Sequence, residues 1–237
     1  MKNLSNAAKI YIFGILLVGL ALTASMLPRL PWANPGLYLL AVLGAIAQTL
    51  KVEGPNDRTN YSIAWFVYGF AFVEYGAAGA MFVIIVAHLV EWAWHKYPWY
   101  IQCFNIGAHV LSAGLAGLVY ALVDEAAAPL HADGAPALIL GMLAFILANH
   151  FLVGVVVWLA RGQSFAESGV FAFLSLFLDF TVVSMGAVTA LLWKYYPLAS
   201  LLNILPLYLL YNALRVPRLR RQIEEMRAPV KAGAAGD

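Results

Sequence analysis

Long runs of apolar residues, separated by short polar stretches, follow one another along almost the whole chain. A helix that crosses a membrane needs about 20 mainly apolar residues in succession. The runs that approach this length are residues 10–26, 37–50, 99–123, 135–160, 170–193 and 198–214. The pattern therefore predicts an all-α fold, a polytopic transmembrane bundle of about 7–8 membrane segments. The first run also resembles a signal peptide, but we expect it to be an uncleaved helix.

Residues 61–94 form a longer apolar stretch of 34 residues. As one helix it would extend about 50 Å, which exceeds a hydrocarbon core of about 30 Å. The alternative is a break near Glu74-Tyr75-Gly76, with segments at 61–73 and 76–94. The first of these is short, so the stretch would contain a half-helix or a re-entrant hairpin.

Composition agrees with a membrane protein and excludes other classes. The chain is 63% hydrophobic and 11% charged, with a mean hydropathy of +0.80, whereas a soluble domain is about half apolar and a quarter charged. A water-soluble enzyme and a disordered chain are both excluded. The net charge of +2 gives no reason to expect a nucleic-acid partner, and the single cysteine, Cys103, excludes an intrachain disulfide.

The distribution of Lys and Arg favours the broken hairpin. Cytoplasmic loops carry an excess of these residues. If 61–94 is split, twelve of the fourteen fall on one side and only Arg29 and Lys194 on the other. A single span would divide them nine to five. We therefore expect a multi-pass protein of the bacterial inner membrane with both termini in the cytoplasm.

The sequence divides into a transmembrane domain, residues 1–214, and a basic tail, residues 215–237. Six of the fourteen Lys and Arg residues lie in those last 23 positions. Residues 214–226 are amphipathic, so they can bind anionic lipid head groups or continue as a helix toward a cytoplasmic protein partner. We expect the end of the tail to be disordered.

Polar residues inside the apolar runs are candidates for function because such groups are costly in a membrane. His109, His150 and Asp179 lie near the middles of three successive predicted helices, Asn105 shares a face with His109, and Asn149 directly precedes His150. These five residues are the predicted ligand-binding site. The alternatives are hydrogen bonds that only join helices, or a haem held between His109 and His150; the residues identify no cofactor.

Four other titratable residues receive a simpler interpretation. His88, Glu91 and His95 fall at i, i+3 and i+7 of one helical face, a spacing that metal ligands also use. Aromatic residues surround the end of this segment and indicate the membrane interface, so we place Glu91 and His95 in a hydrated loop. Glu74 would be solvated at the predicted turn.

Three stretches of the chain resemble a known family. They are Glu91-Trp92 with residues 98–105, residues 111–120, and residues 211–219. They look like the membrane-embedded sensory input modules that precede diguanylate cyclase (GGDEF) and HD-GYP phosphodiesterase domains in bacteria, over about residues 35 to 222. The resemblance implies a sensor or scaffold and supplies no catalytic residues.

The end of the chain departs from that family, because only fifteen residues follow Gln222 and include no output domain. We therefore expect a module that acts alone, signals to a separate partner, or is a fragment. The leading hypothesis is a non-enzymatic membrane sensor or accessory subunit, as a homo-oligomer or in a larger complex. Its alternatives are a haem- or pigment-binding electron-transfer subunit and a transporter subunit. The short hairpin followed by full spans is similar to the substrate-binding subunits of energy-coupling-factor vitamin transporters.

Overall fold

The computed structural model describes residues 1, 4–53, 60–127 and 134–216 of the chain. Within these ranges the fold is the predicted all-α bundle, with six helices long and apolar enough to cross a membrane. They are α1 (Asn6–Met26), α3 (Ala64–His95), α4 (Trp99–Ala127), α5 (Ala135–Arg161), α7 (Phe173–Tyr195) and a terminal helix (Pro197–Val216) that begins as α8 (Pro197–Ser200) and η2 (Leu201–Asn203). The shorter elements are η1 (Leu27–Arg29), α2 (Pro35–Thr49), β1 (Val52–Glu53), β2 (Asn60–Tyr61) and α6 (Phe165–Ser168).

The helix α3 is folded back on itself at Gly76. The side-chain rings of Trp65 and His88, both on α3, pack against the ring of His109. Their centroids lie 5.1 Å and 4.6 Å, respectively, from the His109 centroid. In one straight helix residues 65 and 88 would be about 34 Å apart. Gly76 has φ 67° and ψ −171°, a backbone conformation that essentially only glycine adopts. The predicted break is therefore confirmed, and two antiparallel segments replace one long span.

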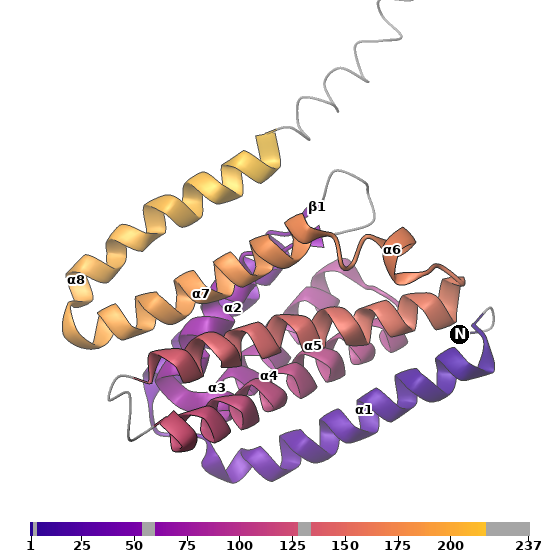
Figure 1. Cartoon of the computed structure of the whole chain (residues 1–237), viewed down its shortest axis with the longest axis horizontal. Helices are drawn as coiled ribbons and strands as arrows, with labels where there is room; N and C mark the ends of the chain where they lie inside the picture. Colours follow the sequence, from indigo (N-terminus) through magenta and orange to yellow (C-terminus); the bar gives the residue numbers. More distant parts are fainter. Residues whose placement is uncertain (2–3, 54–59, 128–133, 217–237) are drawn as a thin grey trace, which may run out of the picture.

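This hairpin occupies the centre of the bundle, between α2, α4 and α7, while α1 and α5 pack on α4 (Figure 1). The contact between α3 and α7 is unusually close. A Cβ atom at Gly186 would lie 1.8 Å from the carbonyl oxygen of Phe66, and one at Gly69 would lie 2.1 Å from that of Val183. Small residues allow this approach, which is how helices associate where lipid removes the hydrophobic driving force.

The two ends of the bundle differ. Met1, the β1–β2 ribbon and α6 lie at one end, called here the amino-terminal end (Figure 1). The turn at Gly76, η1 and the start of α5 lie at the other, called the hairpin end. Between them is a layer of fully buried apolar side chains: Met81, Ile84, Val110, Met142 and Phe145.

Large apolar side chains cover the outer faces of the helices. Leu17, Leu39, Leu122, Phe151 and Phe177 are each more than half exposed. Soluble monomers rarely expose apolar patches of such extent, whereas lipid chains cover them at no cost. The chain is therefore a helical bundle of the multi-pass membrane type. The predicted tail lies, apart from Arg215 and Val216, outside the described residues.

Candidate functional site

A cavity of about 240 Å³ at the amino-terminal end of the bundle brings all five predicted site residues together. Asn105 and His109 come from α4, Asn149 and His150 from α5, and Asp179 from α7. We call this space the polar cavity. Its other lining residues are Gln48, Lys51, Tyr61, Ser62, Trp65, Tyr68, His88, Val153, Val170 and Ser175.

His150 and Asp179 form a bonded pair on one side of the polar cavity. The His150 Nε2 atom lies 2.9 Å from Asp179 Oδ2, and His150 Nδ1 donates to the carbonyl oxygen of Val170. Because a carbonyl oxygen only accepts, Nδ1 carries a proton, and the contact to Asp179 holds a second one. Both nitrogens of His150 are therefore engaged, and the Asp179 carboxyl group has a partner inside the bundle.

A second polar cluster surrounds Glu91, which is fully buried. Its carboxylate pairs with Lys51, accepts from the Nε2 atoms of Gln48 at 3.0 Å and Gln102 at 3.2 Å, and lies 3.1 Å from His88 Nδ1. The placement of Glu91 in a hydrated loop was therefore wrong. The reversal at Gly76 inserts the second half of α3 between α2 and α4, which turns Glu91 inward.

The exposure expected for the other two residues agrees with the structure. His95, the last residue of α3, and Glu74, two residues before the turn at Gly76, are both exposed. The sequence does pair His88 with Glu91 at i, i+3, but it gave no signal for Lys51, which follows α2. Gln48 and Gln102 were also missed, although an amide side chain inside or at the end of an apolar run is such a signal.

The two histidines nearest the middle of the polar cavity each leave one nitrogen available. His109 Nδ1 donates to the carbonyl oxygen of Asn105 at 2.9 Å, so its Nε2 is an acceptor. His88 Nδ1 faces Glu91, and His88 Nε2 is buried without a hydrogen-bond partner in the described part of the chain. The ring centroids of the two histidines are 4.6 Å apart.

Asn149 adds a donor to the acceptor on His109. Its Nδ2 atom is buried and, among the described residues, has no hydrogen-bond partner. A buried polar group left unpaired costs about 1–3 kcal/mol, so the free nitrogens of His88 and Asn149 indicate that something else satisfies them. Trp65 and Tyr68 line the same cavity with aromatic rings, 5.9 Å apart at their centroids. The arrangement suits a small neutral molecule with both donors and acceptors.

The geometry does not support haem between His109 and His150. Haem iron would need a free nitrogen from each ring, and His150 has none. The cavity is also smaller than the roughly 300–1,000 Å³ of pockets that hold drug-sized ligands. Within the described ranges, no group of three or more His, Cys, Asp or Glu residues is arranged to hold a metal ion.

Together, the fold and this cavity define a helical bundle of membrane-spanning character with an internal polar site. Comparisons with family models, curated proteins and solved structures give no match. The resemblance to bacterial sensory input modules therefore stays a prediction.

Proposed function

We propose that the chain is a non-enzymatic integral membrane sensor or accessory subunit that binds a small polar ligand in the polar cavity. The observation that carries this proposal is the pair of unpartnered buried nitrogens, on His88 and Asn149, that line the cavity. The ligand would donate to His109 Nε2, form a hydrogen bond with His88 Nε2 and accept from Asn149 Nδ2. A flat ring would also pack against Trp65 and Tyr68.

The helix α7 connects the polar cavity to the terminal helix. It supplies Ser175 and Asp179 to the polar cavity at one end, and near its other end Thr189 Oγ1 accepts from Asn203 Nδ2 of the terminal helix at 2.9 Å. That helix projects along α7 with most of its surface uncovered (Figure 1). A ligand that also contacts Ser175 or Asp179 would shift α7, and with it the terminal helix and any protein partner bound to that helix.

The two alternatives from the sequence receive less support. A transporter subunit would pass one substrate between the two ends of the bundle. The polar cavity lies at the amino-terminal end, but the larger cavity at the hairpin end is mainly apolar, so the two do not suit the same substrate. The buried layer around Met81 and Phe145 separates them. An electron-transfer subunit would need the ligation geometry that His150 lacks.

Native mass spectrometry of the full chain, extracted from its source membrane, tests the proposal. His109→Phe keeps an aromatic ring but removes Nε2, and Asn149→Leu removes Nδ2 at similar volume. We expect the unaltered chain to carry a molecule of defined mass that both variants lose. The retained fraction should fall at least about tenfold, because each variant leaves a polar group of the ligand unpaired.

His95→Phe is the matched control, since His95 lies on α3 but is exposed. It should retain the molecule in full. A chain that carries only bilayer lipid in all four forms would contradict ligand binding, and so would equal retention by His109→Phe and His95→Phe.

A further inference from the structure

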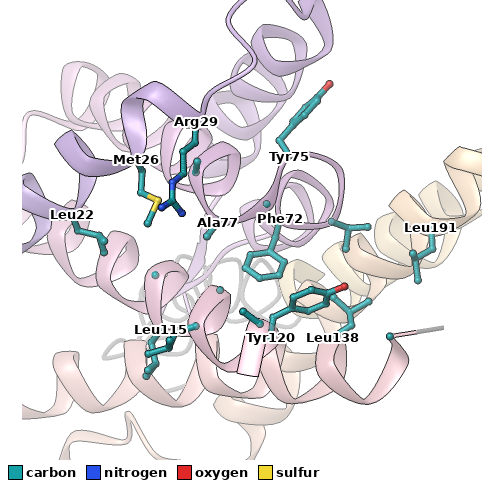
Figure 2. A pocket seen from close by; sticks show the side chains of 18 residues that line it. Leu22, Met26, Arg29, Phe72, Tyr75, Ala77, Leu115, Tyr120, Leu138 and Leu191 are labelled. Carbon is teal, nitrogen blue, oxygen red and sulfur yellow. The ribbon is translucent and has the colours of Figure 1, made fainter. Parts of the chain in front are cut away.

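The hairpin end of the bundle contains a second and larger cavity, of about 870 Å³. Its walls come from the ends of α1 and α7, from the turn of α3, from the second half of α4 and from the start of α5. Figure 2 shows Leu22, Met26, Phe72, Ala77, Leu115 and Leu138 around it. We call it the apolar cavity.

One positively charged side chain lies at the wall of the apolar cavity. Among the described residues that line the cavity, only Arg29 of η1 is charged, and in Figure 2 its guanidinium lies beside Met26 and Ala77. In the described part of the chain it makes no ion pair. Arg29 is itself exposed, so it lies at the rim of the cavity. Glu74 and Asp124, two described acids on α3 and α4, are also exposed and are not among the lining residues. The described wall therefore combines a mainly apolar surface with one positive charge that no described acid pairs.

The apolar cavity is independent of the polar one. On α4, Asn105 and His109 line the polar cavity, while the apolar cavity begins at Gly114. The fully buried Val110 lies between them on the same helix. The two spaces also differ in chemistry, so they select different molecules.

We propose that the apolar cavity binds a single-chain amphiphile with one anionic group, a long-chain carboxylate, whose head pairs with Arg29. A planar carboxylate matches the guanidinium fork with two parallel hydrogen bonds. One positive charge neutralises one negative charge, and the apolar walls cover the hydrocarbon chain. A volume of about 870 Å³ lies within the range for one drug-sized ligand, about 300–1,000 Å³, which favours one acyl chain over a two-chain phospholipid.

A photoactivatable palmitate tests this site on the full chain in nanodiscs of uncharged phosphatidylcholine. The probe carries its reactive group along the chain, and the matched alcohol carries the same group with a neutral head. We expect the palmitate to label buried or half-buried residues of the cavity wall, such as Phe72 and Leu138, and to compete with unlabelled palmitate. Arg29→Gln should reduce palmitate labelling about tenfold, the loss of a charge-assisted pair, and leave labelling by the alcohol unchanged.

Two further variants separate the outcomes. Lys194→Gln removes another exposed cation near the end of α7 that does not line the cavity, and it should leave labelling intact. Ala121→Trp introduces bulk at the cavity wall and should reduce labelling by both probes.

Equal labelling by palmitate and alcohol, unaffected by Arg29→Gln, would overturn the proposal in favour of a space filled by bilayer lipid. Labels confined to outer-face residues such as Leu17 and Phe177 would overturn it as well. Neither result bears on the polar cavity.

Discussion

Glu91 illustrates how a charged side chain is accommodated inside this bundle. It is fully buried, yet Lys51 supplies a countercharge, and two amides and a histidine hold Oε2. Burying an ion is costly unless it is both paired and hydrogen-bonded. The cluster meets both conditions and joins α2, α3 and α4 beside the polar cavity.

Removal of Lys51 should therefore destabilise the protein far more than removal of an exposed cation. Lys51→Met leaves the Glu91 charge buried and uncompensated, a cost of about 3–5 kcal/mol. For a domain of this size, that lowers the melting temperature by at least about 6 °C, measured by tryptophan fluorescence in detergent. Lys194→Met is the control and should have almost no effect.

The double variant Lys51→Met/Glu91→Gln distinguishes the ion pair from simple packing. With the carboxylate neutralised, no unpaired charge remains, so we expect much of the lost melting temperature to return. Additive losses from the two substitutions would contradict a coupled pair.

At the scale of elements, the hairpin in α3 decides the architecture. One residue, Gly76, reverses the chain. The reversal places Trp65 and His88, from its two halves, against His109 of α4. Both halves thereby contribute to the polar cavity. The site depends on the turn although the turn lies at the opposite end of the bundle.

Gly76→Ala should destabilise the hairpin through its backbone alone. A Cβ atom at residue 76 meets no other atom within 4 Å, so no clash contributes. The positive φ with extended ψ costs an L-residue about 1–3 kcal/mol, which should appear as a lower melting temperature in the same fluorescence assay.

Gly14→Ala provides the comparison. Its Cβ would also meet nothing within 4 Å, but Gly14 lies inside the regular helix α1. Alanine favours a helix over glycine by about 1 kcal/mol, so this variant should be neutral or more stable. Equal effects at both positions would contradict the role of the turn.

At the scale of the whole molecule, the two ends carry different cavities. The polar one lies at the amino-terminal end, near the cluster around Glu91, and the apolar one lies at the hairpin end, near Arg29. The excess of Lys and Arg on one side of the split chain predicts that the amino-terminal end faces the cytoplasm. The polar cavity would then take a cytoplasmic ligand and the apolar cavity one from the outer leaflet.

Cysteine labelling in intact cells checks this orientation. In a Cys103→Ser background, Ala33→Cys places a thiol at an exposed residue of the hairpin end, and Ala166→Cys places one on exposed α6. A membrane-impermeant maleimide should label Ala33→Cys in intact cells and Ala166→Cys only after permeabilisation. The reverse pattern would invert the topology and exchange the compartments that the two cavities face.

The sequence by itself determined the class of fold, the membrane-spanning segments and the chain reversal near Gly76. Apolar runs of membrane-spanning length require helices, because backbone groups in lipid must bond within their own segment. The excessive length of residues 61–94 required a reversal, and a glycine was available at its turn. The scarcity of polar groups in the spans also singled out His109, His150 and Asp179 together with their neighbouring asparagines.

Only the tertiary structure decided which polar groups meet. The pairing of Asp179 with His150 rather than His109 depends on how each helix is rotated and on its depth, and spacing along one helix does not fix either. The burial of Glu91, against a sequence pattern typical of an interface, follows from the chain reversal at Gly76. The apolar cavity has the same origin, since its walls belong to elements far apart in the chain that the packed hairpin brings together.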